Sequence, residues 1–513
     1  MQIEFNKRQF YWKIMSVLLM LIVLCISCEE EGSSTDPTSQ AHDPSKPVLV
    51  SDFTPKEGGA YQKLVIYGEN FGNDLSMVKV TIGNKEATVI SVKNNNIYCF
   101  VPTGAFSGEI KVTIGDEGNA KEVIAQEAFT YEKKKVVGTL VGYRNEYDNQ
   151  GWRDGPFETA AGFRNDGCLM FDPLNKNHLY VVYDHADIQL LDLEKREVST
   201  PIHRSSFGDR RLRSIDFTND GEYMVVSVDF DGWGTGNSPS VYILKRNPDG
   251  TFTDQGGPQL VASYMKTNGA ALHPVNNNEL YFNSYERGQV FRMDISNYFE
   301  TINSGGNWDP NRDGGNYTEL FTIQDTGWEF KIHMHPTGNY AYIVVINQHY
   351  ILRTDYNWAE KRFAPAYVVA GQARSPGWID GAGTTARLDR PYQGVFVKNP
   401  AYVEEGRADI YDFYFAEKSN HAVRKLTSEG IVSTFAGRGR AGQAADNNFW
   451  GTEDGDLREV ARFRDPTGIA YDEESDTFYI LDTVGRKIRT ISMEEEEDFP
   501  VDDTESEEED SND

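Results

Sequence analysis

The sequence predicts an all-β protein in which a small β-sandwich is followed by a β-propeller. Apolar runs of about six residues alternate with polar residues and are separated by Gly, Asn and Pro turns, as in short strands joined by tight turns. Aromatic residues make up 12% of the chain, and long amphipathic helical patterns are missing. A length of 513 residues exceeds one ordinary core, and two domains account for it.

The N-terminus predicts a secretion signal over residues 1–27. Three basic residues, Lys7, Arg8 and Lys13, precede an apolar run over 17–26. This run is too short for a stable membrane-spanning helix, whereas its length and basic flank are typical of a signal peptide.

The end of this run carries a lipidation signal. A small residue, Ser27, precedes Cys28, an arrangement that resembles the lipobox cleaved by lipoprotein signal peptidase. The resemblance implies that Cys28 becomes the first residue and carries lipid. An ordinary signal peptide with an incidental cysteine is the alternative, because Cys25 is untypical at the lipobox leucine position. Acylation of Cys25 itself is disfavoured by the bulky Leu24 beside the cleaved bond.

Residues 28–46 predict a flexible tether. Three glutamates at 29–31 are followed by Gly, Ser, Thr and Pro. The acidic start resembles the export signal of Bacteroidetes lipoproteins that face outward from the outer membrane. We therefore expect a protein anchored by lipid in the outer membrane and facing the cell exterior, since several acyl chains give stable anchoring where one does not.

Residues 47–132 predict the sandwich. The segments TPKEGG, VIYGENFG and VTIGNKEATV place Gly and Asn at turns between period-2 strands. They resemble the IPT/TIG immunoglobulin-like domain. In surface proteins such domains are usually spacers or docking modules, and no catalytic pattern is present here.

Residues 135–493 predict a six-bladed propeller. Six segments share an apolar strand, a polar turn and a second strand rich in Tyr and Val, at spacings of about forty-five to seventy-five residues that suit one four-stranded blade each. They begin near Cys168, Arg213, Ala270, Lys331, Gly394 and Gly468. The last two units have Gly-rich lead-ins and basic closing strands that resemble NHL repeats. The strand 136–141 matches the closing strands of other units, so we expect it to complete the sixth blade and remove an open edge.

Loops between the units hold the candidate ligand-binding residues. Several pair a tryptophan with an Asp-Gly, and on one rim they would offer flat apolar platforms beside carboxylates. Sugars suit such a site, because their C–H faces stack on Trp and their hydroxyls bind carboxylates. The alternative is that the Asp residues cap turns and the Trp residues cover blade junctions. The candidates are Trp152, Asp154, Trp233, Trp378, Asp380, Trp450 and Asp454.

No catalytic residue, metal site or cofactor is predicted. His273-Pro274 and His335-Pro336 occupy the hairpin position held by Asp172-Pro173 in the first unit, which favours a turn role over metal binding. Some six-bladed relatives hold a divalent metal in the channel, so a channel metal stays an open alternative. The spacing of Cys99 and Cys168 supports neither a zinc site nor a nucleophile, and both are expected to be buried free thiols.

The charge excludes one class of partner. A net charge of −29 would repel a phosphate backbone, so nucleic acid is not an expected partner. Much of this charge lies in residues 494–513, which hold thirteen acids and no base and predict a solvated, disordered tail.

The function that these features favour is glycan binding at the cell surface without catalysis. The protein resembles lipoproteins that Bacteroidetes place beside outer-membrane glycan porters and glycosidases, which are therefore its expected partners. Two alternatives remain: a propeller enzyme, either a hydrolase or a lyase, acting on a sugar or lactone, and a scaffold that binds proteins. Propeller enzymes gather their catalytic residues from several blades, so the missing local motif does not decide between them.

Overall fold

The computed structural model describes residues 40–105, 107–116, 118–142, 151–230, 238–276, 278–311, 316–325, 329–439 and 449–494. The chain folds as two compact units that divide between Glu132 and Lys133. Within these ranges no helix is both long and apolar enough to cross a bilayer. The signal peptide, Cys28, most of the tether and nearly all of the acidic tail lie outside the described residues.

The first unit is a β-sandwich. One sheet has the order β1-β3-β7-β6 and the other the order β2-β9-β8-β4-β5, with antiparallel pairing except between β2 and β9. The strands are β1 (Leu49–Thr54), β2 (Glu57–Gly58), β3 (Lys63–Glu69), β4 (Val78–Ile82), β5 (Lys85–Glu86), β6 (Thr88–Lys93), β7 (Asn96–Phe100), β8 (Gly108–Ile114) and β9 (Lys121–Tyr131).

Alternation along these strands builds the core of the sandwich. In β8 the side chains of Ile110, Val112 and Ile114 are fully buried, and the residues between them are more exposed. This is the period-2 pattern of a sheet with one buried face. Cys99 lies in the same core as a free thiol, and burial raises its pKa to about 12.

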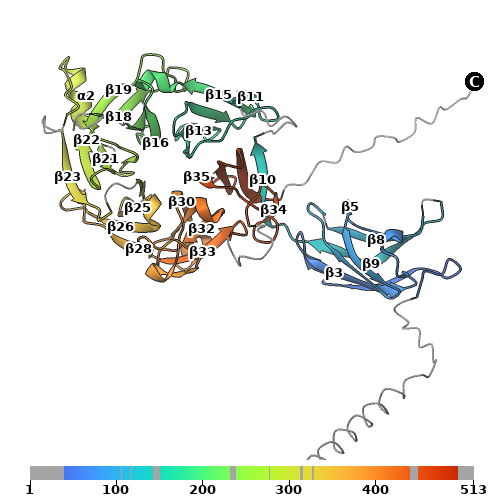
Figure 1. Ribbon diagram of the computed structural model, residues 1–513. Helices are drawn as coiled ribbons and strands as arrows, with labels where there is room; N and C mark the ends of the chain where they lie inside the picture. Colours follow the sequence, from blue (N-terminus) through green and yellow to red (C-terminus); the bar gives the residue numbers. More distant parts are fainter. Residues whose placement is uncertain are drawn as a thin grey trace, which may run out of the picture. The chain divides into compact units, whose positions relative to one another are not determined.

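The described strands of the second unit form six sheets arranged in a ring (Figure 1). We number these blades I to VI in chain order. Blade I contains β11 (Gly155–Pro156), β12 (Gly167–Phe171), β13 (His178–Tyr183), β14 (Ile188–Asp192) and β15 (Glu197–Ile202). Blade II contains β16 (Arg211–Phe217), β17 (Tyr223–Asp229), β18 (Ser238–Lys245) and β19 (Gln259–Tyr264). Blade III contains β20 (Ala270–Leu272), β21 (Glu279–Ser284), β22 (Gln289–Asp294) and β23 (Tyr317–Thr322).

The remaining three blades are also antiparallel sheets. Blade IV contains β24 (Phe330–Met334), β25 (Tyr340–Val345), β26 (Tyr350–Asn357), β27 (Arg362–Phe363) and β28 (Tyr367–Gly371). Blade V contains β29 (Gly381–Ala382), β30 (Pro391–Lys398), β31 (Tyr411–Glu417), β32 (Ala422–Leu426) and β33 (Ile431–Ala436). Blade VI contains β34 (Gly455–Asp456), β10 (Lys135–Val141), β35 (Pro466–Asp472), β36 (Thr477–Asp482) and β37 (Lys487–Met493).

Short helical segments connect some strands. The α-helices α2 (Ser296–Asn303) and α3 (Pro400–Glu404) follow β22 and β30. The 3-10 turns are η2 (Leu75–Met77), η3 (Arg204–Phe207), η5 (Ile346–Gln348), η6 (Gly383–Thr385) and η7 (Lys418–Asn420).

Second strands of the blades are buried on both faces. Every residue of β13, β21, β25 and β36 is buried, because each sheet is covered by a neighbouring blade on either side. This explains why these segments are nearly continuous apolar runs instead of alternating ones. The six predicted strand pairs are confirmed, from β12 with β13 to β35 with β36.

The ring closes through its first strand. β10 pairs with β37 from Lys135 opposite Met493 to Val141 opposite Ile488, and it also pairs with β34. The prediction that residues 136–141 complete the sixth blade is confirmed. The first and last strands of the propeller thus share one sheet, so no sheet edge is left open where the ring of blades closes.

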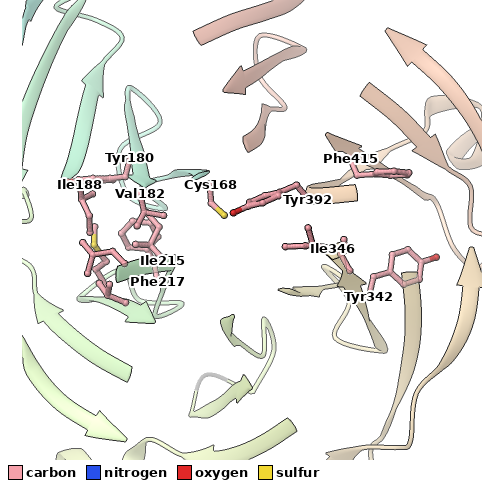
Figure 2. Packing of buried hydrophobic residues seen from close by; sticks show 14 of the residues in the cluster. Cys168, Tyr180, Val182, Ile188, Ile215, Phe217, Tyr342, Ile346, Tyr392 and Phe415 are labelled. Carbon is pink, nitrogen blue, oxygen red and sulfur yellow. The ribbon is translucent and has the colours of Figure 1, made fainter. Parts of the chain in front are cut away.

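One cluster of buried side chains extends from blades I and II to blades IV and V. Cys168 of β12 and Tyr392 of β30 belong to it and point toward one another in the close-up (Figure 2). Cys168 is a buried free thiol, as the sequence predicts.

Candidate functional site

Two ends of the propeller channel carry different side chains. The channel is lined by one inner strand of each blade, namely β12, β16, β20, β24, β30 and β35. Each inner strand runs from one end of the channel to the connection that leads into the neighbouring strand of its sheet, which we call the second strand. We call the end where inner strands begin the start face. The end where they turn into the second strands is the hairpin face.

The predicted Trp-Asp-Gly loops precede three consecutive blades. Trp378 precedes blade V, Trp450 precedes blade VI and Trp152 precedes blade I. Each loop continues into a two-residue strand that pairs with the outermost long strand of its blade. Trp152 contacts Tyr183, which lies opposite the first residue of β12, so this loop is at the start face.

The three loop carboxylates are bound within their own blades. Asp154 accepts hydrogen bonds from Gln189 at 3.3 Å and Thr200 at 2.9 Å. Asp380 accepts from Arg424 at 2.6 Å and from the Thr434 hydroxyl at 3.1 Å. Asp454 accepts from Arg489 at 2.5 Å and Thr139 at 3.1 Å. The structure therefore does not gather these carboxylates at one point, and each one fastens a loop to its blade.

Two of the tryptophans are partly covered. The Trp152 ring meets Tyr183 edge-on, with 4.8 Å between ring centroids, and lies so close to Gly162 that a Cβ there would overlap it. The Arg424 guanidinium lies 4.3 Å from the centroid of Trp378, whose ring also abuts Gly439. These contacts agree with a role in covering blade junctions.

Trp450 is the most accessible of the described candidate tryptophans. The Arg464 guanidinium stacks 4.4 Å from its ring centroid, and 42% of the residue is exposed. Arg464 lies two residues before β35, which places Trp450 at the start face of blade VI. The remaining candidate, Trp233, lies outside the described residues.

Ion pairs join different blades at the start face. Asp184 accepts from Arg211 at 2.7 Å and Arg213 at 2.8 Å, and Arg213 also pairs with Glu329 at 2.6 Å. Burial acts to raise the pKa of Asp184, but the hydrogen bond from Arg211 and the charge of Arg213 hold it below its usual value. These residues come from blades I and II and from the segment just before blade IV, so the network ties non-adjacent blades together.

Two long side chains cross the channel further in. Lys331 of blade IV donates to the backbone carbonyls of Arg213, at 2.7 Å, and Asn268, at 3.3 Å. Gln393 of blade V accepts from the backbone amides of Leu169, at 2.8 Å, and Ile469, at 2.9 Å. Inner strands have an unpaired edge toward the channel, and these side chains satisfy its polar groups.

Beyond this level the channel widens into a depression at the hairpin face. Its volume is about 420 Å³, and all six inner strands line it together with hairpin residues such as Pro173 and Pro336. The side chains at its wall are mostly apolar, including Phe171, Phe396 and Tyr471. Volumes of this order hold small-molecule ligands in other proteins.

The His-Pro pairs stabilise hairpin turns. His273 Nδ1 accepts from the backbone amide of Asn276 at 3.0 Å, as Asp172 accepts from that of Leu174 at 2.9 Å in blade I. His335 Nδ1 contacts the Thr337 hydroxyl at 2.7 Å. The predicted turn role is confirmed. Over the described ranges no three His, Cys, Asp or Glu residues are grouped so that they could hold a metal ion.

Comparison with known proteins identifies relatives of both units. The IPT/TIG domain family matches residues 47–131, which confirms the resemblance seen in the sequence. No curated protein matches the chain. Among the solved structures that match it, three from Bacteroides are at least 34% identical and cover 89% of the chain.

A Bacteroides thetaiotaomicron protein named "Putative phosphatase" is 56% identical, with a TM-score of 0.81, 89% of this chain and 99% of that chain covered. An "auxiliary nutrient binding protein" of the same species is 43% identical, with a TM-score of 0.76 and coverage of 89% and 100%. A protein of that name from Bacteroides ovatus is 34% identical, with a TM-score of 0.62 and the same coverage. The chain belongs to the family of these three Bacteroides proteins.

The sequence alone did not identify three polar side chains that line the channel. Lys331, Gln393 and Asp216 are polar side chains in the largely buried inner strands β24, β30 and β16. A polar residue in a buried strand needs a partner, so each was a detectable signal of a special position. Each of the three has a partner on another blade, and local sequence patterns do not identify such partners.

Proposed function

We propose that this protein is a surface lipoprotein that binds a nutrient glycan on the start face of its propeller and presents it to partner proteins. Two relatives, 43% and 34% identical, are named auxiliary nutrient binding proteins, which supports a nutrient-binding role. The observation that carries the carbohydrate assignment is Trp450, a half-exposed indole at the start of blade VI.

The neighbouring loops extend this surface. Trp378 and Trp152 hold equivalent positions on the blades before and after Trp450, so aromatic rings follow the rim over three consecutive blades. Sugar rings stack on indole faces, and the fixed carboxylates beside them accept hydroxyl hydrogen bonds. A polysaccharide that met more than one ring at a time would gain avidity from the second contact.

The test is affinity electrophoresis and calorimetry of the purified protein with plant, host and microbial glycans. We expect one polysaccharide to retard the protein, and Trp450→Ala to weaken the binding about thirtyfold, the effect of losing ~2 kcal/mol at a hot spot. The matched control is Trp358→Ala. Trp358 is also an exposed tryptophan, at 46%, but its indole donates to Asn339 in the hairpin of blade IV.

Other outcomes point to the alternatives. New reducing ends in the incubated glycan would make the protein a hydrolase or lyase. Release of phosphate from a sugar phosphate would favour the activity in the name of the 56% identical relative. Equal loss of binding in both tryptophan variants would contradict the proposed site, and the absence of any glycan binding would favour a protein scaffold.

We also propose that lipid on Cys28 holds the protein in the outer membrane, facing outward, beside a glycan porter and glycosidases. The basis is the lipobox-like sequence and the acidic residues after it. Cys28→Ala is expected to move the protein from the membrane fraction to the soluble fraction. An unchanged distribution, or protection of the wild type from protease added to intact cells, would contradict the anchor or its orientation.

A further inference from the structure

The depression at the hairpin face is separate from the proposed glycan surface. It lies at the other end of the channel, and Lys331 and Gln393 cross the space between the two ends. It draws its lining from all six blades and has a volume of about 420 Å³. A recess of this size and shape takes a small molecule instead of a polymer chain.

Aromatic and sulfur-containing side chains form its walls. Phe171, Phe396 and Tyr471 are half-buried, as are Met170 and Met334. Two of the aromatic rings also contact residues that do not line the depression. Phe171 packs edge-on against Tyr479 with 5.4 Å between ring centroids, and the Tyr471 hydroxyl donates to Asp476 at 2.9 Å. Such walls favour a ligand with an apolar, preferably flat, body.

A single carboxylate interrupts these walls. Asp216 of β16 lines the depression. Its two carboxylate oxygens accept hydrogen bonds from the backbone amides of Phe217, at 2.8 Å, and Leu272, at 2.7 Å. Each carboxylate oxygen still has a lone pair for a further donor. Among the described residues no Lys, Arg or His is paired with this carboxylate, on which only burial and these two backbone hydrogen bonds act.

Neither of the two lysines that line the depression is paired with Asp216. Lys331 donates to the carbonyls of Arg213 and Asn268, and Lys176 lies among the hairpin residues at the margin of the depression. A carboxylate without a counter-ion in an apolar recess is costly, and burial raises the pKa of Asp216 to about 6. A cation brought by a ligand would remove that cost.

We propose that the hairpin-face depression binds a hydrophobic organic ammonium ion, whose N–H groups donate to Asp216 and whose apolar body packs against Phe171, Phe396 and Tyr471. The charge sets the orientation and the aromatic walls supply the contact area. The attraction between an ammonium group and aromatic faces adds to the selectivity for a cation. This site is independent of the glycan surface around Trp450.

The test compares ligands of one shape and three charges by calorimetry: tryptamine, tryptophol and indole-3-propionate, with hexylamine as a second cation. We expect both amines to bind, tryptophol to bind at least tenfold more weakly than tryptamine, and indole-3-propionate to bind least. Asp216→Asn should weaken tryptamine at least tenfold and leave tryptophol nearly unchanged. Trp450→Ala should leave tryptamine affinity unchanged, which separates this site from the glycan site.

Two further variants complete the design. Glu473→Gln is the matched control, because it removes one negative charge from an exposed hairpin position in blade VI that does not line the depression. It should leave tryptamine binding unchanged. Lys176→Met removes a positive charge, of the same sign as the ligand, from the margin of the depression and should strengthen tryptamine binding a few-fold. This variant decides the question if Asp216→Asn does not fold.

The proposal is overturned by any of three results. These are binding of neither amine at millimolar concentration, tighter binding of indole-3-propionate than of tryptamine, and unchanged tryptamine affinity in a folded Asp216→Asn protein. Weaker tryptamine binding in Lys176→Met would also overturn it, because removal of a positive charge from the margin should favour a cation held at Asp216.

Discussion

The buried guanidinium of Arg424 donates to the loop carboxylate of Asp380 across 2.6 Å. Arg424 is fully buried, whereas the Asp380 side chain is 51% exposed. The same guanidinium pairs with Glu417, which is fully buried, at 2.5 Å. One arginine thus connects a surface loop of blade V to a charge in the interior. Arg489 makes the same connection in blade VI.

Removing the arginine and removing the loop carboxylate should have different effects on stability. Arg424→Met leaves Glu417 buried without its cation, and we expect the free energy of unfolding to fall by about 3–5 kcal/mol. Asp380→Asn removes only a half-exposed partner and should cost less than about 1 kcal/mol. Urea unfolding followed by tryptophan fluorescence measures both. Equal losses in the two variants would show that the loop contact, and not the buried pair, stabilises the blade.

The closing strand β10 offers a second prediction. Val137 is 1% exposed and packs in the core between blades V and VI, whereas Val136 beside it is half-exposed. Val137→Asp buries an unpaired charge, and we expect a loss of at least about 3 kcal/mol and a clearly lower Tm. Val136→Asp is the matched control and should change Tm little. If both variants keep the wild-type Tm, pairing of β10 with β37 does not hold the ring closed.

The thiol of Cys99 should resist alkylation while the sandwich is folded. Burial raises its pKa to about 12, so its thiolate fraction at pH 8 is about a thousandfold lower than that of an ordinary cysteine. Iodoacetamide labelling of the Cys99 peptide, followed by mass spectrometry, should be at least about a thousandfold slower in native protein than in urea. The raised pKa also means that stability falls as pH rises above about 9, where only the unfolded thiol ionises. Rapid labelling of native protein at pH 8 would contradict this burial.

The repeated strand pairs were predictable because they are local. In every blade except V the inner and second strands are joined by a short turn, so apolar runs, with Asp-Pro or His-Pro turns in three blades, mark them directly. In blade V residues 399–410, which include α3, join the two strands. The match of residues 136–141 to other closing strands likewise predicted that β10 completes blade VI. This pairing joins Lys135 to Met493, and only the similarity of the repeats reveals it.

The candidate site was predictable only in part, for a physical reason. The sequence placed tryptophans beside Asp-Gly turns, but it did not show that Asp454 is bound by Arg489 and Asp380 by Arg424. These partners are buried arginines on later strands. The depression was missed altogether, because its lining comes from six strands spread over the whole propeller and converges only when the ring closes.

Tryptamine binding at the depression should weaken at acidic pH. Asp216, whose pKa is about 6, loses its charge below that pH, whereas the ammonium group of the ligand stays protonated. Between pH 7 and pH 5 we therefore expect about a tenfold rise in the Kd of tryptamine, and little change from pH 7 to 8.5.

The other titratable side chains that line the depression do not reproduce this profile. Burial lowers the pKa of His333 to about 3 and raises that of Tyr471, so neither changes charge between pH 5 and 8.5. Lys176, Lys331 and the buried free Cys168 also line the depression. Calorimetry at five pH values tests the prediction, with neutral tryptophol and the Asp216→Asn variant as pH-independent controls. A tryptamine Kd that stays constant down to pH 5, or that falls with acidity, would rule out the Asp216 carboxylate as the group that holds the ammonium ion.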